Sequence, residues 1–387
     1  MKKIIVFLLI FLFPINVFSL SIKSKHAILY NLNDDEILYN LDQDTRISIA
    51  SMTKIMTCII AIESVDELEK QVTITSPMFY RLIEEGASVA GFEVGEIVTY
   101  RDLLYGLMLP SGADAAQALA ISISGNLDEF VSKMNEKAKK LNLKNTHFSN
   151  PAGLDSKYNY SSVYDVAQIL KYALKNDTFK SIFNAEKYTT SNSKHTFIST
   201  RNKYDIDTSF IDGSKTGFTY DAGLCLASTS HYNGVNYLLV TANAPYNDKT
   251  THFKDAKEIY SYYFKNYENK IIINKDERIT QISLMDGQVI TYTNTDDVKK
   301  YLKKDCNIKK EYIGKTKVTE DIHLNDKIGE YIIKCDDELI YKKNIYLYAD
   351  TTIIKKDSIN IINVCIIAIS CSILLILIIL LKRRKHY

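Results

Sequence analysis

Helix-like and strand-like patterns lie in separate stretches of this 387-residue chain, and this separation is typical of an α+β fold. Segments 27–30 and 37–39 predict a hairpin that precedes the helical stretch. An apolar face over 251–267 predicts a helix that packs on a sheet. The other expected helices cover 51–63, 102–109, 114–122, 128–141 and 162–174, and the expected strands cover 210–218, 224–230 and 235–243.

The last third of the chain has a different pattern. The helical periodicity disappears from Glu268, and short apolar runs alternate with Asn, Asp, Gly and Lys, which predicts a small all-β domain. We therefore expect one domain over 21–267 and a second, β-rich domain over 268–357. The apolar runs of the second domain are 271–273, 279–284, 289–292, 331–333 and 345–348.

Apolar segments at the two ends predict export and membrane anchoring. Basic residues precede a short apolar stretch, a pattern typical of a secretory signal peptide over 1–20. Segment 358–381 contains an uncharged apolar run of about 23 residues, which is long enough for a transmembrane helix; a buried core helix is the alternative. The basic tail 382–387 favours a cytoplasmic C-terminus. We therefore expect a single-pass protein of the cell membrane whose body lies on the extracytoplasmic face.

Charge and cysteine content exclude several kinds of site. The 48 Lys and Arg residues nearly balance the 46 Asp and Glu residues, and the body between the apolar ends is slightly acidic. We therefore expect no nucleic-acid partner. The six cysteines show no metal-ligand spacing, and we expect neither a metal nor a cofactor. Cys306 and Cys335 either form a disulfide or remain buried thiols.

Ser51 and Lys54 form the first candidate catalytic pair. The apolar residues that follow Lys54 predict a helix beginning at Ser51, with the two side chains one turn apart on the same side. The N-terminus of a helix offers N–H groups and partial positive charge to an oxyanion. A buried lysine near another cation loses its proton readily, so Lys54 is suited to activate the Ser51 hydroxyl as a base.

A second Ser-x-x-Lys spacing, from Ser191 to Lys194, is an alternative pair. It lies in a polar stretch with no apolar helix behind it, so neither a helix dipole nor burial would activate its lysine. His147 and His195 are further candidates for acid–base chemistry. Neither has a partner motif, and we interpret His147 as structural and His195 as a solvated polar residue.

Two further motifs supply groups that suit a substrate. Lys215-Thr216-Gly217 lies on a predicted strand, where a glycine lets a ligand approach the backbone and a lysine with a hydroxyl suits a carboxylate. Ser111-Gly112-Ala113 follows a proline in a loop between two predicted helices. The three motifs stand in order on a helix start, an interhelical loop and a strand, a combination that chance rarely produces.

The residues around these motifs carry a family resemblance, in the segments 50–57, 109–115, 150–154 and 212–218. In this order the motifs resemble those of the penicillin-recognising serine enzymes, which include class A β-lactamases and penicillin-binding proteins. Over roughly 25–267 the chain is most similar to the low-molecular-weight D-alanyl-D-alanine carboxypeptidases. The resemblance implies a β-lactamase/transpeptidase-like domain, an antiparallel sheet with a helical subdomain, followed by the small β domain and the transmembrane helix.

The resemblance also implies a role for each motif residue. Ser51 would be the acylated nucleophile, Lys54 its base, and Ser111 the relay that passes the proton to the leaving amine. Backbone N–H groups of Ser51 and Phe218 would form the oxyanion hole. The substrate would be a peptidoglycan stem peptide ending in D-Ala-D-Ala, and β-lactams would be covalent inhibitors. The substrate-binding residues would be Lys215 and Thr216, which hold the terminal carboxylate, with Gly217 and Phe218 beside them.

One residue departs from the family pattern and leaves alternatives open. Ala113 stands where most members have an Asn whose amide binds the substrate and orients the lysine. Loss of one such polar contact typically costs about 1–3 kcal/mol, which slows acylation without abolishing it. We expect a serine-type D-Ala-D-Ala carboxypeptidase. The alternatives are a β-lactamase-like hydrolase and a non-catalytic module that binds penicillin or wall peptide.

Overall fold

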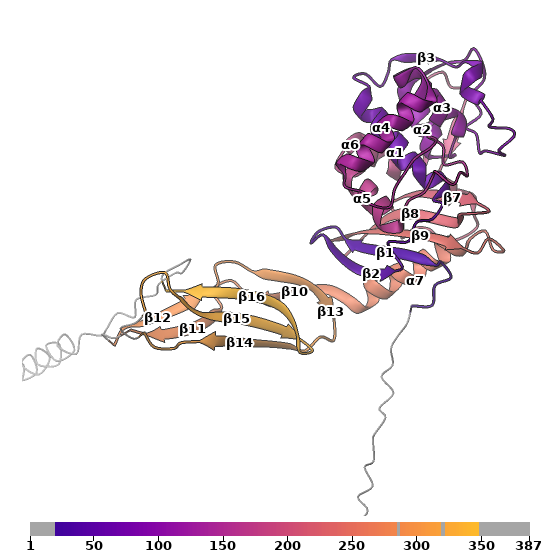
Figure 1. Ribbon diagram of the computed structural model, residues 1–387. Helices are drawn as coiled ribbons and strands as arrows, with labels where there is room; N and C mark the ends of the chain where they lie inside the picture. The colour runs from indigo at the N-terminus through magenta and orange to yellow at the C-terminus, as the bar shows by residue number, and fades with distance from the viewer. Residues whose placement is uncertain (1–19, 285–286, 319–321, 348–387) are drawn as a thin grey trace, which may run out of the picture. The chain divides into compact units, whose positions relative to one another are not determined.

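The computed structural model describes residues 20–284, 287–318 and 322–347 (Figure 1). Within these ranges the chain forms two compact units that divide after Lys265. The first unit contains all three motifs, and the second contains the β-rich segment.

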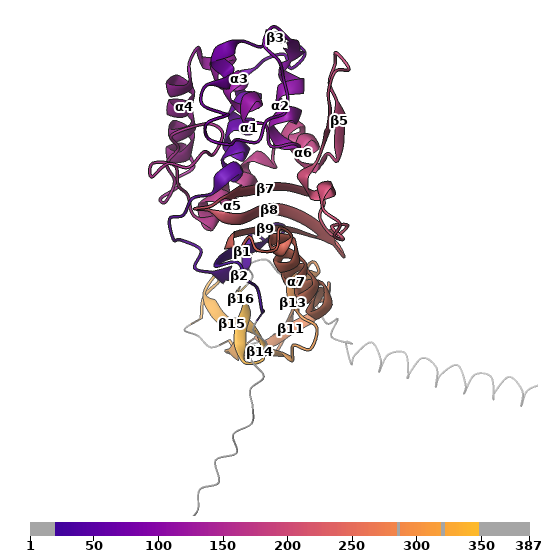
Figure 2. The same ribbon diagram turned by 90° about the vertical axis from the view of Figure 1, so that its right-hand side faces the viewer.

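The first unit is built on a five-stranded antiparallel sheet in the order β2-β1-β9-β8-β7 (Figures 1 and 2). The expected strands 224–230 and 235–243 are joined as a hairpin through Asn233 and Gly234, and both residues have the positive φ angles, 49° and 78°, that such a turn requires. Helix α7 (Thr251–Asn266) packs on one face, where the Tyr260 hydroxyl donates a hydrogen bond to the Ser228 carbonyl. The strands are β1 His26–Asn31, β2 Glu36–Leu41, β7 Gly213–Thr219, β8 Gly223–Tyr232 and β9 Val235–Ala244.

A helical subdomain lies on the side of the sheet opposite α7 (Figure 2). Helix α1 (Thr53–Ser64) is at its centre, and every residue from Thr53 to Ala61 is buried. A helix that is buried on all sides has little freedom to move, so α1 is a rigid support for the residues at its N-terminus. The other elements are η1 Ala50–Met52, η2 Ser76–Phe79, α2 Tyr100–Met108, α3 Ala113–Ser124, α4 Leu127–Lys140, α5 Val163–Ala173, α6 Asp177–Asn184, η3 Thr200–Lys203, β3 Gln71–Thr73, β4 Ile97–Thr99, β5 Lys187–Thr189 and β6 Thr196–Ile198.

The start of the first helix differs from the prediction. Ser51 lies in the short 3-10 turn η1, and α1 begins two residues later at Thr53. The Met52 N–H donates to the Ile49 carbonyl, three residues back, as in a 3-10 turn, and Ala50 has a φ of 44°, in the left-handed region, so the right-handed helix cannot extend back beyond Ser51. Ser51 is therefore held on a turn that precedes the helix.

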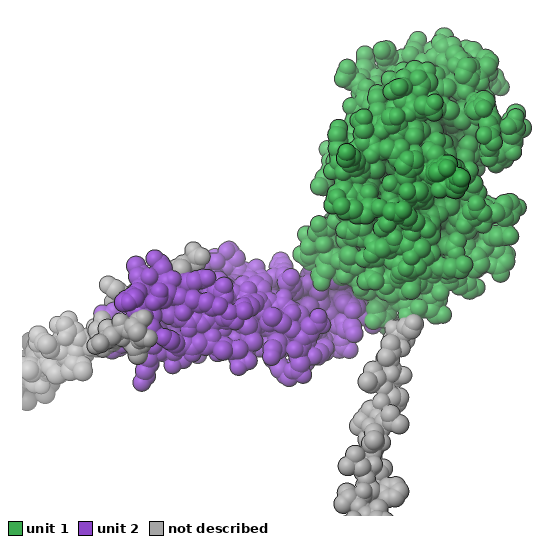
Figure 3. Space-filling view, in the orientation of Figure 1, with its two compact units in different colours: residues 1–265 green, residues 266–387 purple. Residues whose placement is uncertain are grey.

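The second unit, which is purple in Figure 3, is composed of short antiparallel strands around a small apolar core. The apolar runs predicted from the sequence fall on β10, β11, β12, β15 and β16, whereas the lysine-rich strands β13 and β14 were not expected. A disulfide joins Cys306 and Cys335. The strands are β10 Tyr267–Ile273, β11 Arg278–Ser283, β12 Val289–Thr293, β13 Val298–Lys303, β14 Ile308–Gly314, β15 Lys327–Cys335 and β16 Glu338–Tyr346.

One part of the expected fold class, the transmembrane helix, is wrong. Across the three described ranges, no helix is long and apolar enough to cross a membrane. The 16-residue helix α7 would extend only about 24 Å at 1.5 Å per residue, and one of its faces is polar. The predicted segments 358–381 and 382–387 lie outside the described residues, as does nearly all of the predicted signal peptide 1–20. The described residues therefore fold into an α+β unit with a helical subdomain, followed by a small β unit.

Candidate active site

The turn that carries Ser51 is enclosed by two glycines from distant parts of the chain. A Cβ atom at Gly153 would lie 2.0 Å from the Ala50 carbonyl oxygen, and one at Gly217 would lie 3.0 Å from the Ser51 nitrogen. Only glycine permits such close contact, so the 150–154 loop and strand β7 both reach the backbone of the turn. The left-handed Ala50 is a strained position of the kind that clusters at active sites.

Lys54 is buried directly behind Ser51. Its Nζ donates hydrogen bonds to Ser51 Oγ at 2.9 Å and to the Ala152 carbonyl oxygen at 2.5 Å. Burial lowers the pKa of Lys54 from 10.5 to about 7, although the negative charge of Asp114 opposes this shift. A large fraction of Lys54 is therefore neutral near pH 7 and can accept the proton of the Ser51 hydroxyl.

The carbonyl that accepts a hydrogen bond from Lys54 is positioned by the 150–154 loop, one of the segments that carry the family resemblance. Asn150 Oδ1 accepts hydrogen bonds from the backbone N–H groups of the three residues 152–154. The Thr57 hydroxyl donates to the carbonyl of Pro151. These contacts aim the Ala152 carbonyl at Lys54, whereas Ala113, which is buried, offers no side-chain amide. A backbone carbonyl thus binds the lysine that an Asn would orient in the usual family pattern.

Ser111 and Lys215 form a second hydrogen-bonded pair. Lys215 Nζ donates to Ser111 Oγ at 2.8 Å and to the Thr216 carbonyl at 2.9 Å. Burial, with the nearby positive charges of Lys54 and Lys203, holds the pKa of Lys215 well below 10.5. Ser111 has a φ of 68° and presents its hydroxyl from the loop between α2 and α3. The Lys215 amino group therefore reaches the cleft through Ser111 and does not line it.

Both serines face one cleft of about 560 Å³. Strand β7, at the edge of the sheet, contributes Thr216, Gly217 and Phe218, and the Thr216 hydroxyl donates to Thr200 Oγ1 at 2.9 Å. The structure thus brings the Ser51–Lys54 pair, Ser111 and the β7 motif to a single site. The cleft is lined by Ser51, Gly86, Ser88, Pro110, Ser111, Thr200, Lys203, Tyr204, Thr216, Gly217, Phe218, Tyr220, Leu224, Tyr246, Lys249 and His252.

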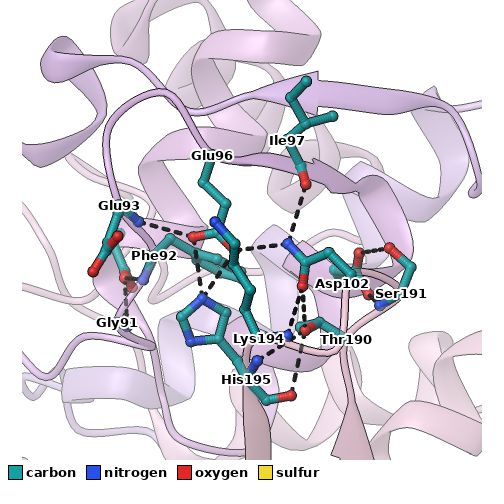
Figure 4. Close-up of polar contacts among 12 residues, drawn as sticks. Gly91, Phe92, Glu93, Glu96, Ile97, Asp102, Thr190, Ser191, Lys194 and His195 are labelled. Carbon is teal, nitrogen blue, oxygen red and sulfur yellow. Dashed lines mark hydrogen bonds and ion pairs between the residues drawn. The ribbon is translucent and has the colours of Figure 1, made fainter.

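The alternative Ser-x-x-Lys pair lies elsewhere, in the turn of the β5–β6 hairpin (Figure 4). Ser191 Oγ donates to a carboxylate oxygen of Asp102 at 2.6 Å. Burial by itself would raise the pKa of Asp102. Hydrogen bonds outweigh this effect and lower the pKa, and the largest contribution among them comes from the Ser191 hydroxyl. The Ser191 hydroxyl therefore uses its proton in a hydrogen bond to the Asp102 carboxylate at the start of α2. His195 Nε2 lies 2.9 Å from Glu96 Oε1, so it belongs to the same structural network and is not simply solvated as we expected.

His147 also lies outside the cleft, since it is absent from the residues that line it. Its Nδ1 is 2.6 Å from the Tyr158 carbonyl oxygen, and its backbone pairs with Tyr160 in a short bridge. These contacts fit a structural residue.

The fold and the cleft together define a serine hydrolase that acts through an acyl-enzyme. Residues 15–246 match the family described as D-alanyl-D-alanine carboxypeptidase, peptidase S11, and the chain belongs to this family. It is a serine-type D-Ala-D-Ala carboxypeptidase. The family assignment favours this activity over the β-lactamase-like and non-catalytic alternatives.

Individual relatives agree with this assignment. The chain is 30% identical over 331 residues to the D-alanyl-D-alanine carboxypeptidase DacF of Bacillus subtilis, covering 82% of this chain and 83% of the relative. It resembles the crystal structure of the Streptomyces K15 DD-transpeptidase at 32% identity and a TM-score of 0.58, over 62% of this chain and 97% of that one. Penicillin-binding protein 5 of Haemophilus influenzae matches at 25% identity and a TM-score of 0.64, over 84% and 97%.

The lowered pKa of Lys54 predicts how activity depends on pH. Because the base must be deprotonated, kcat/KM for a D-Ala-D-Ala peptide should rise with pH through about 7 and then level off. At pH 6 it should be roughly a tenth of the plateau value. The measurement is release of free D-alanine between pH 5.5 and 9. Lys54→Arg, whose guanidinium keeps its proton, should be inactive throughout this range. A flat wild-type profile would contradict this role for Lys54.

The close contact at Gly153 predicts a separate effect on catalysis. Gly153→Ala places a Cβ against Ala50 and displaces the Ser51 turn, so acylation by penicillin should slow at least tenfold. Gly125→Ala is the matched control, because Gly125 has nearly the same φ (83° against 81°) but nothing within 4 Å of its Cβ position. Both variants should lose roughly 1–2 kcal/mol of stability from the left-handed backbone. Equal acylation rates for the two variants would argue against the steric explanation.

Proposed function

We propose that Ser51 is the acylated nucleophile and Lys54 the base that activates it. The observation that carries this proposal is the 2.9 Å hydrogen bond between Lys54 Nζ and Ser51 Oγ, made by a lysine whose pKa is near 7. A neutral amine at this distance takes the hydroxyl proton as the oxygen attacks the peptide carbonyl. The second contact of Lys54, to the Ala152 carbonyl, keeps the amine oriented in the absence of an Asn at Ala113.

The backbone N–H groups of Ser51 and Phe218 are the proposed oxyanion hole. Support comes from the approach of Gly217 to the Ser51 nitrogen, which brings β7 beside the nucleophile turn. N–H groups held by a sheet strand and a constrained turn need little reorganisation when negative charge develops on the carbonyl oxygen. Loss of one such donor typically costs about 2.7–4 kcal/mol of transition-state stabilisation.

Ser111, Lys215 and Thr216 are proposed to act on the leaving D-alanine. Its terminal carboxylate accepts a hydrogen bond from the Thr216 hydroxyl, which lines the cleft and turns its proton from Thr200 Oγ1 to the carboxylate when the peptide binds. Lys215 attracts the same carboxylate and polarises the Ser111 hydroxyl that it contacts. Ser111 can then relay the proton from Lys54 to the departing amine.

The complete reaction removes the terminal D-alanine of a stem peptide that ends in D-Ala-D-Ala. The Ser51 Oγ–carbon bond forms, the peptide C–N bond breaks, and the amine leaves with the relayed proton. Water then cleaves the ester, giving the shortened peptide and free Ser51. A β-lactam would acylate Ser51 by the same attack and remain bound as a covalent inhibitor.

We also propose that the catalytic unit works on the extracytoplasmic face, where peptidoglycan is found. The Cys306–Cys335 disulfide supports this location, because disulfides persist in oxidising compartments. The unpaired thiols among the described residues, Cys58 and Cys225, are buried and thereby protected from oxidation.

Replacing Ser51 tests the nucleophile directly. Ser51→Ala should abolish covalent labelling by penicillin and lower D-alanine release at least a thousandfold, because the acylated oxygen is gone. Ser191→Ala is the control and should keep both activities, since Ser191 bonds to Asp102 away from the cleft. Labelled penicillin with peptide mapping, together with a D-alanine assay, measures the two outcomes. Label on another serine, or unchanged release by Ser51→Ala, would sink the proposal.

Lys215 should determine the preference for a free terminal carboxylate. Lys215→Ala removes a charge-assisted interaction, so kcat/KM should fall by roughly ten- to a hundredfold for the acid peptide. The same peptide with an amidated terminus should lose much less. Lys203→Ala, which removes a cleft cation that does not contact Ser111, should have the smaller effect of the two. If Lys215→Ala still separates acid from amide as strongly as wild type, Lys215 does not sense the carboxylate.

A further inference from the structure

Three exposed aromatic side chains surround one part of the catalytic cleft. Phe218, Tyr220 and Tyr246 all line it, and their exposed fractions are 44%, 78% and 50%. Each ring contacts the other two in an edge-on arrangement, with centroids 5.4–5.6 Å apart. We refer to these residues as the aromatic triad. Aromatic rings gathered at the surface leave apolar area in water, and such patches usually mark a binding surface.

The triad does not serve the proposed chemistry through its side chains. Only the backbone N–H of Phe218 has a proposed role, and Tyr220 and Tyr246 have none. Tyr220 follows the end of β7, whereas Tyr246 comes from the loop between β9 and α7. Two separate segments therefore converge to place apolar rings beside the reaction centre.

The direction of the substrate along β7 places the triad on its acyl side. Strand β7 is at the edge of the sheet, so its outer backbone groups are available to an extended peptide. The proposed carboxylate contact is at Thr216 and the proposed oxyanion contact at Phe218, so the peptide runs from its C-terminus toward Tyr220. An extended chain advances about 3.3 Å per residue. The residue that precedes the D-Ala-D-Ala pair therefore comes beside Phe218 and Tyr220.

We infer that the aromatic triad is a specificity subsite for the side chain of this preceding residue, and that it selects a long aliphatic side chain over a short one. The inference rests on the proposed function, which sets the direction of the peptide. Ring faces exposed in a concave site bury methylene groups with little loss of conformational freedom. Thr216 and Phe218 are two residues apart on β7, so their side chains lie on the same face of the strand. The carboxylate contact and the triad are therefore on the same side.

The charges of the cleft indicate that methylene groups are recognised, and not a terminal ammonium. Lys203 and Lys249 line the cleft, and among its lining residues none is Asp or Glu. A cation would therefore gain from the ring faces but be repelled by Lys249, which lies in the same loop as Tyr246. A long neutral side chain meets no such opposition.

Matched peptides and variants test the inference. The substrates are N-acetyl-X-D-Ala-D-Ala with alanine, norleucine or lysine as X, and the readout is kcat/KM for D-alanine release. Wild type should prefer norleucine to alanine by roughly tenfold and should not prefer lysine to norleucine. The double variant Tyr220→Ala/Tyr246→Ala should lose most of this preference while its rate of acylation by penicillin stays near that of wild type. Tyr220→Phe/Tyr246→Phe keeps both rings and should keep the preference.

Tyr232→Ala is the control for loss of an exposed tyrosine, since Tyr232 is 39% exposed and does not line the cleft. It should retain the wild-type preference. The inference is wrong if the double Ala variant discriminates as wild type does, if it loses rate equally on alanine and norleucine peptides, or if its defect appears only with substrates that carry the disaccharide. The last result would assign the rings to the glycan.

The test also separates this inference from the function on which it rests. Equal wild-type rates on the alanine and norleucine peptides would refute the subsite but leave the proposed function intact. No release of D-alanine from any of the peptides would refute the proposed function, and the subsite with it.

Discussion

The buried amine of Lys54 is the interaction on which the active site depends. An ordinary lysine is charged near neutral pH and cannot accept a proton, but burial brings the pKa of Lys54 to about 7. Burial also requires that its remaining hydrogen bonds be satisfied, and the Ala152 carbonyl provides one of these acceptors. The rigid, fully enclosed start of α1 keeps the amine in place behind Ser51.

Close backbone packing provides the second constraint. The Ser51 turn, the 150–154 loop and strand β7 are far apart in sequence, yet two glycines allow them to touch. Gly153 fits against the Ala50 carbonyl, and Gly217 lets β7 approach the Ser51 nitrogen. Because the contacts involve backbone atoms, a single methyl group is enough to disturb them. The same packing explains why Ala50 keeps its left-handed backbone conformation, because the surrounding atoms leave no room for another conformation.

Two Ser-x-x-Lys pairs in one chain show why spacing alone does not define a catalytic site. Ser51 meets a buried lysine in a cleft, whereas Ser191 donates its hydroxyl to the carboxylate of Asp102 and Lys194 is exposed. The aromatic triad makes a related point about composition. A single tyrosine in the sequence does not indicate a binding site. Tyr220 and Tyr246 come together beside the cleft only once the chain has folded.

The sequence by itself determined the α+β class, the order of most elements and the three motifs, because these depend on local periodicity and short spacing. It misplaced the helix start at Ser51 and did not indicate strands β13 and β14, whose lysines obscure the apolar alternation. Its transmembrane helix is not part of the described fold. Only the tertiary structure decided that the Ala152 carbonyl binds Lys54 and that Lys215 is hydrogen-bonded behind Ser111. These contacts join residues about a hundred positions apart, and no local pattern in one sequence records which distant backbone atoms will meet.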